Sequence, residues 1–186
     1  MLNLIKPTAG KMLISEPFMS DPNFKRSVVY LTEHNEQGSV GFVLNQKTEL
    51  TLNNLVDDIE EADFPVYIGG PVGNDSLHYI HTINDLDGCV SVDNGIYWGG
   101  NFELLKILIQ AGKVERNEIR FFIGYSGWGE TQLQDELDEN AWLVAETNKD
   151  FLFGESNERE LWAHAVKSLG EKFAMIINFP ENPRFN

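Results

Sequence analysis

Short apolar segments rich in β-branched and aromatic residues follow one another along this chain, often with no helical pattern between them. Two of them, SVVYLTEH (27–34) and SVGFVLNQ (39–46), are joined by Asn-Glu-Gln-Gly, a connection suited to a β-hairpin. Other segments with strand character are 11–15, 64–70, 77–83, 89–92, 118–124, 142–147 and FAMII (173–177). Because strands outnumber helices and do not strictly alternate with them, we expect an α+β fold with a mixed, mostly antiparallel sheet. A barrel-like and a split arrangement of that sheet both stay open.

Helical patterns are fewer, and three to four helices are expected to pack on the sheet. NFELLKILIQAG (101–112) has Asn101 as N-cap and Gly112 at its end, and it is apolar on nearly all sides, which predicts deep burial. In TQLQDELDENAW (131–142), Thr131 and Gln134 are spaced as a capping box. A capped helix is predicted for 157–170, beginning at Asn157, and a short helix for 51–59. GGPVGNDS (69–76) is expected to be a loop.

The length of 186 residues and a hydrophobic content of 42% predict one domain, residues 1–186, with its own core. Residues 178–186 are expected to be a loose C-terminal tail. No apolar run approaches the roughly 20 residues needed to span a bilayer. No secretory signal pattern opens the chain, so a cytoplasmic protein without a membrane role is the simplest expectation.

The chain is strongly acidic, with 29 Asp and Glu against 14 Lys and Arg and a formal charge of −15. Electrostatic attraction to phosphates is the main sequence-independent source of nucleic-acid affinity, so direct nucleic-acid binding is disfavoured. A protein partner or a small ligand fits the acidity better. Solubility is the plainest reason for the charge.

The segment RFFIGYSGWG (120–129) resembles the strand–turn–helix setting in which α/β-hydrolases hold a nucleophilic serine. That elbow requires Gly-x-Ser-x-Gly, but Gly127 falls one place early and Trp128 occupies the position of the second glycine. Only His164 follows Ser126 along the chain as a candidate base. A hydrolase using Ser126 is therefore the alternative hypothesis, and no catalytic residue is assigned.

Metal and cofactor sites find little support in the sequence. Cys89 is the only cysteine, which excludes an intramolecular disulfide or a cysteine-based zinc cage. His78 and His81 are three apart in a predicted strand, a spacing that directs them to opposite faces. GGPVGND lacks the pattern of a phosphate-binding loop. We predict neither a metal nor a cofactor.

Several motifs together resemble the AlgH/YqgE family of bacterial proteins. They are DPNFKRSVVYLTEHNEQGSVGFVLNQ, YIGGPVG, LHYIHTI and RFFIGYSGWGETQLQDELDENAWLV, in the order and spacing of that family. The resemblance extends from Met12 to about Gly170. It implies a compact α+β cytosolic protein of largely uncharacterised function, without established catalytic residues. One branch of the family was named for a link to transcriptional control, so a regulatory role enters as an expectation.

The family pattern maps onto glycines, rings and amides of this chain: His34, Gly38, Gly41, Asn45, Gly69, Gly70, Pro71, Gly124, Tyr125, Trp128, Gln132 and Leu133. The family often has Ala where this chain has Ser126, which weakens the nucleophile hypothesis. The chain departs from the pattern at Thr131, where Gly is usual, and at 145–148, where an Ala-Pro-Ala-like stretch is usual.

The leading hypothesis is a non-enzymatic binding or regulatory protein that acts through a protein partner or a small ligand. Rings and amides beside glycine turns are typical of a shallow recognition surface. The candidate residues are His34, Asn45, Gly69, Gly70, Pro71, Tyr125, Ser126, Gly127, Trp128 and Gln132. The competing interpretation is structural: Tyr125 and Trp128 would simply cover the core at a strand end.

Overall fold

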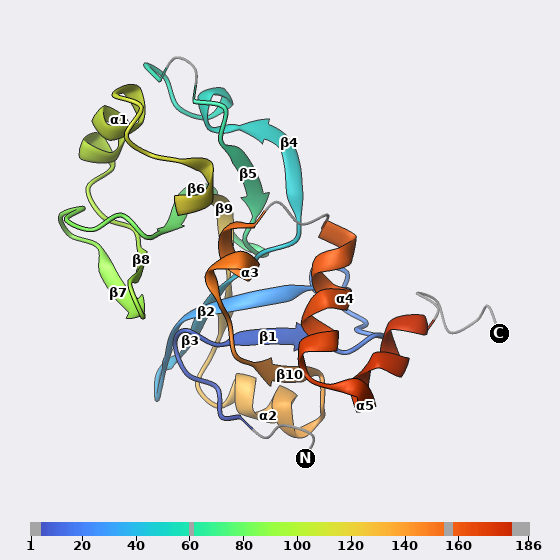
Figure 1. The fold of residues 1–186 in the computed structure, drawn as a ribbon. Helices are drawn as coiled ribbons and strands as arrows, with labels where there is room; N and C mark the ends of the chain where they lie inside the picture. Colours follow the sequence, from blue (N-terminus) through green and yellow to red (C-terminus); the bar gives the residue numbers. More distant parts are fainter. Residues whose placement is uncertain (1–4, 60–61, 155–157, 180–186) are drawn as a thin grey trace.

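A computed structural model describes residues 5–59, 62–154 and 158–179, and in them ten strands form one mixed, open sheet. Figure 1 shows the sheet in two parts, one carrying β1, β2, β3 and β10 and the other carrying β4 to β8. The strands are β1 (Met12–Ser15), β2 (Val28–Asn35), β3 (Gly38–Val43), β4 (Lys47–Thr51), β5 (Pro65–Ile68), β6 (Val72–His81), β7 (Val90–Asp93), β8 (Ile96–Trp98), β9 (Ile119–Trp128) and β10 (Trp142–Ala145). The expected α+β class and the mostly antiparallel sheet are confirmed, and the barrel-like alternative is not.

Five α-helices and three short 3-10 segments accompany the sheet in the described residues, slightly more than the three to four helices expected. The α-helices are α1 (Phe102–Gln110), α2 (Gln132–Asp138), α3 (Lys149–Phe153), α4 (Glu158–Ser168) and α5 (Glu171–Ala174). The 3-10 segments are η1 (Leu52–Asn54), η2 (Arg116–Glu118) and η3 (Met175–Asn178). Within the ranges described, no helix is long and apolar enough to cross a membrane.

Strand β9 joins the two parts of the sheet. Its first half pairs in parallel with β5 and antiparallel with β6, and its last residues pair antiparallel with β3. The change occurs at Gly124, whose φ of +67° is a left-handed value that side chains rarely adopt. Phe122 and Tyr125, three residues apart, both contact the same apolar cluster, so the alternation of side chains shifts by one at this glycine.

The part of the sheet around β1 and β2 is covered on both faces. Met12 and Ile14 contact a cluster under α3, α4 and α5, whereas Leu13 contacts a cluster under α2. Burial of alternate residues on opposite faces explains why these strands read as continuous apolar runs. This arrangement is visible in Figure 1, where α2 and α4 lie beside β1 and β10.

The other part of the sheet has a cluster of its own, contributed by β5, β6, β9, α1 and the segment after β4. Its members include Leu52, Val66, Tyr79, Leu105 and Phe121. Helix α1 is less buried than its sequence predicts: only Leu105 is fully buried, and Ile107 is 60% exposed. A short helix at the margin of the sheet cannot bury all of its sides, so the expectation of deep burial was wrong.

Several other expectations need correction. The segment after residue 70 is not a loop, because β6 begins at Val72, and the predicted helix at 51–59 is only the 3-10 turn η1 after the unpredicted strand β4. FAMII is helical, forming parts of α5 and η3. Thr131 does not cap α2, because its φ is +63° and its side chain makes no capping hydrogen bond. Asn157 and residues 180–186 of the expected tail lie outside the described residues.

Candidate functional site

Ser126 is not in a turn but inside β9, and it is fully buried. Its hydroxyl donates a hydrogen bond to the carbonyl oxygen of Gly69 at 2.9 Å, and the same oxygen accepts the amide of Val43. A hydroxyl that is buried and used in this way is neither exposed nor activated as a nucleophile needs to be. The elbow interpretation of RFFIGYSGWG is therefore wrong in its geometry.

Gly69 and Gly70 allow the chain between β5 and β6 to lie directly against β9. A Cβ on Gly69 would come within 2.3 Å of the carbonyl oxygen of Gly124, and one on Gly70 within 2.3 Å of that of Tyr125. Real Cβ atoms do not approach backbone so closely, so these positions need glycine for packing between backbones. Close packing against β9 is therefore enough to explain why the sequence has glycine at both positions.

Trp128 is 4% exposed and lies in the cluster under α2. Its indole N–H donates to Oε2 of Glu136 at 2.9 Å, and the indole of Trp142 donates to the same oxygen at 2.7 Å. Gln132 donates to the other oxygen, Oε1, at 2.9 Å and accepts the amide of Gly129. One carboxylate thus joins both tryptophans to the start of α2, so Trp128 and Gln132 support the fold here.

The remaining candidates are dispersed. Asn45 is half-buried and ties down the chain before β2, because its side chain accepts from the amide of Val28 and donates to the carbonyl of Arg26, both at 2.9 Å. His34 is exposed on the β2–β3 hairpin, with Nδ1 2.7 Å from Oγ of Ser39. Pro71 and Gly127 are exposed. None of the candidates lines the cavity described next, although the ring of Tyr125 contacts that of His78, which does line it.

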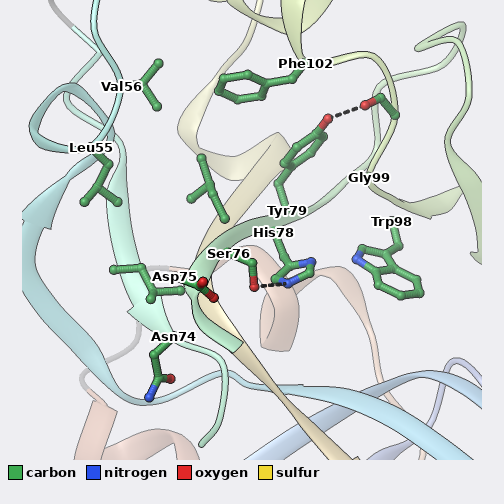
Figure 2. Close-up of a pocket in the computed structure, with 13 residues that line it drawn as sticks. Leu55, Val56, Asn74, Asp75, Ser76, His78, Tyr79, Trp98, Gly99 and Phe102 are labelled. Atoms are coloured by element: carbon green, nitrogen blue, oxygen red, sulfur yellow. Dashed lines mark hydrogen bonds between the residues drawn. The ribbon is translucent and has the colours of Figure 1, made fainter. Parts of the chain in front are cut away.

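A cavity of about 710 Å³ lies along β6, lined by residues 74–79 of that strand together with Ile123 of β9. Strand β8 pairs with β6 only at Ile80 and His81, so the edge of β6 before these residues is not covered by β8. We call this cavity the β6 pocket. Figure 2 shows Leu55 and Val56 on one side and Tyr79, His78 and Trp98 on the other, with Phe102 of α1 above.

The polar groups of the β6 pocket come from β6 itself: Asn74, Asp75, Ser76 and His78. Oγ of Ser76 donates to the carbonyl of Gly73 at 2.6 Å and lies 3.0 Å from Nε2 of His78. Since a hydroxyl has one hydrogen and a carbonyl can only accept, Nε2 of His78 is the donor to Ser76. Burial lowers the pKa of His78 below its ordinary 6.5, so the ring is neutral at pH 7.

The wall opposite Leu55 is held rigidly by hydrogen bonds to the two glycines between β8 and α1. The hydroxyl of Tyr79 donates to the carbonyl of Gly100 at 2.6 Å, and burial raises the pKa of Tyr79 to about 12. Nε2 of His81, which is fully buried, donates to the carbonyl of Gly99 at 2.8 Å. Trp98 packs against Phe42 with ring centroids 5.8 Å apart. The ring wall is therefore formed before any ligand arrives.

No group of three or more His, Cys, Asp or Glu able to hold a metal ion occurs in the residues that the structure describes. Cys89 is half-buried.

The family assignment rests on the length of the match: a model of the AlgH-like family matches residues 12–174. The chain belongs to the AlgH-like family. Among its AlgH-like relatives, a UPF0301 protein of Cytophaga hutchinsonii is 42% identical over 181 residues, which cover 96% of this chain and 99% of that protein. A UPF0301 protein of Bacteroides thetaiotaomicron is 40% identical over 186 residues, covering 99% of this chain and 94% of that protein.

Solved structures agree with the AlgH-like fold. The solution structure of the AlgH protein from Pseudomonas aeruginosa has a TM-score of 0.74 at 29% identity and covers 96% of this chain and 98% of that one. A crystal structure of the protein DIP2367 from Corynebacterium diphtheriae has a TM-score of 0.78 at 20% identity, with 94% of each chain covered. At that identity the second likeness concerns the fold alone.

The residues of the β6 pocket were missed because nothing in the sequence sets them apart. LHYIHTI marks a strand, but a strand pattern does not reveal that its edge is left open. The one usable signal was the i, i+2 spacing of Ser76 and His78, which directs both to the same face of a strand.

Proposed function

We propose that this protein is a non-enzymatic binding protein that holds a small ligand in the β6 pocket. The observation that supports this most is the pocket itself: about 710 Å³, walled by apolar and aromatic side chains, with a few polar groups at one end. Ligand sites of proteins commonly have this volume and composition. The wall is preformed by the bonds of Tyr79 and His81 to the glycines, which reduces the entropy that binding would cost.

A regulatory role through a protein partner remains part of this proposal, with the ligand as its input. The charge of −15 still argues against direct contact with nucleic acid. Regulation would then depend on a second protein that binds the ligand-bound form of this chain and not the ligand-free form.

The alternative proposal, a hydrolase, has less support. The hydroxyl hydrogens of both Ser126 and Ser76 are used on carbonyl oxygens, at Gly69 and Gly73. A serine-directed fluorophosphonate should therefore leave the folded protein unlabelled. Labelling that disappears in Ser76→Ala or Ser126→Ala would favour the enzyme over the binding protein.

Quinoline, a neutral bicyclic ring, is a suitable first probe of the pocket. In 15N NMR spectra, quinoline should shift the indole resonance of Trp98 saturably while leaving those of the buried Trp128, Trp142 and Trp162 in place. Trp98→Ala should weaken binding, followed through the amides of Leu77 and Tyr79. Phe18→Ala, which removes an exposed ring outside the pocket, is the control. Absence of saturable shifts, or equal binding by Trp98→Ala, would overturn the proposal.

A further inference from the structure

Three aromatic rings border the β6 pocket: Tyr79 on β6, Trp98 at the end of β8 and Phe102 at the start of α1. Tyr79 and Phe102 have ring centroids 5.8 Å apart, and Trp98 lies 6.2 Å from the ring of His78. The faces of aromatic rings are electron-rich and attract cations, and Trp is the strongest of the three in this respect. Rings gathered around a cavity are also the usual way in which proteins recognise quaternary ammonium groups.

Negative charge predominates around the pocket. Asp75 is the only charged side chain among the residues that line it. Asp75 is exposed, and no ion pair joins it to another of the described residues. The segments 55–58, 74–79 and 98–106, each of which contributes lining residues, hold four acids and a single basic residue, Lys106. Lys106 itself is paired with Glu103 at 2.8 Å.

One feature of the pocket would favour an anion, namely the amino-terminal end of α1 with its positive dipole. The partial positive charge at that end of α1 is already compensated within the protein. The side chain of Asn101 accepts the amide of Leu104 at 3.0 Å, and Glu103 places a carboxylate in the first turn. The neutral imidazole of His78 adds no positive charge at pH 7. Nothing that lines the pocket therefore offers a full positive charge to a phosphate or carboxylate.

We infer that the ligand of the β6 pocket is a planar organic cation, which stacks on its rings and places its charge beside Asp75. This inference rests on the binding function proposed above and names the chemical class of the ligand. Phosphorylated and other anionic metabolites are thereby excluded as ligands.

Three bicyclic probes of similar size and different charge test the inference: N-methylquinolinium, quinoline and naphthalene-1-sulfonate. Isothermal titration at pH 7.5 and low salt gives their dissociation constants. The cation should bind roughly 3- to 30-fold more tightly than quinoline, as the range of cation–π energies implies, and the sulfonate most weakly. Added salt should reduce the difference in affinity between N-methylquinolinium and quinoline, because it screens the attraction between the cation and Asp75.

Asp75→Asn should weaken binding of N-methylquinolinium and leave that of quinoline unchanged. Asp138→Asn changes the net charge equally but lies on α2, away from the pocket, and is the matched control. If all three probes bind equally, or the sulfonate binds best, the cation inference is overturned while the binding function stands. If none of the three binds, both fail. A cation preference that Asp138→Asn reduces as much as Asp75→Asn would reveal a general charge effect and overturn the role of Asp75.

Discussion

The two ends of β9 differ in how their sequence and structure relate. At its carboxyl end, the residues with the most recognisable pattern, among them Gly69, Ser126 and Trp128, are buried and hydrogen-bonded to one another or to α2. At its amino end, the neighbouring strand β6 has an open edge and a cavity, lined by residues outside the set of glycines, rings and amides onto which the family pattern maps. A family pattern of glycines and rings can therefore record how backbones pack, while the cavity lies elsewhere.

Tryptophan substitutions give the largest expected contrast between the two ends. Trp128→Ala removes a side chain that is 4% exposed and should lower the free energy of unfolding by about 3–5 kcal/mol. Trp98→Ala removes a half-buried side chain and should cost clearly less. Urea denaturation of both variants measures this. Equal losses would contradict this contrast, and a stable Trp128→Ala that has lost ligand binding would restore Trp128 as a site residue.

Glycine substitutions test the packing of backbones at the carboxyl end. Gly69→Ala should destabilise by about 1–3 kcal/mol or more, because its new methyl group would meet the carbonyl of Gly124. Gly127→Ala is the matched control, since the nearest atom to a Cβ there is in the ring of Tyr125, at 3.3 Å. Thermal unfolding should separate the two. Similar melting temperatures would contradict the close packing inferred at Gly69.

The carboxylate of Glu136 should matter through its bonds to two indoles. Glu136→Ala removes the carboxylate that accepts both indole N–H groups and should cost about 1–3 kcal/mol. Glu136→Gln keeps an oxygen acceptor and should cost less. Glu139→Ala, an exposed position after α2, controls for loss of charge. A Glu136→Ala variant as stable as Glu139→Ala would show that the indoles do not depend on this residue.

Lowering the pH should have a smaller effect on the free energy of unfolding, and this effect should come from the two histidines of β6. Burial lowers the folded pKa of His78 and His81, so below the ordinary value of 6.5 the unfolded chain binds protons that the folded chain does not. Stability is therefore full above pH 6.5 and falls as the pH decreases, by at most about 1.4 kcal/mol per pH unit for each group. The fully buried His81 should contribute more than the half-buried His78.

Melting temperatures between pH 7.5 and 5.5 check this, above the range in which carboxylates titrate. The exposed His164→Gln should keep the slope, whereas His81→Asn should be less stable at pH 7.5 and show a flatter pH dependence. An unchanged slope in His81→Asn would assign the effect to other groups.

The sequence predicted those parts of the fold that depend on local patterns. The β2–β3 hairpin was found because two β-rich runs flank a polar turn, and α1 because Asn101 and Gly112 mark its ends. Residues whose structure depends on distant partners were misjudged. Ser126 seemed to stand in a turn because it follows Gly124, but the strand continues through that glycine by pairing with β3.

The sequence predicted which residues are distinctive, but it did not predict where in the fold a cavity lies. The family pattern singles out Trp128 and Gln132, but their shared acceptor, Glu136, lies in the acidic run DELDE (135–139), in which the sequence does not distinguish it from its neighbours. The β6 pocket exists because β8 ends at Trp98 and does not pair with the earlier residues of β6. The sequence of β6 itself does not indicate where its pairing partner ends.

The position of β9 in the chain also affects how the protein is made. β9 is the common neighbour of β3, β5 and β6, which leave the ribosome well before residues 119–128. Until then, each of these strands has at least one edge with unpaired backbone groups, the kind of edge at which nascent chains associate with one another. Translation must therefore pass residue 128 before the sheet can close, so a pause or truncation before that residue leaves edges of β3, β5 and β6 unpaired.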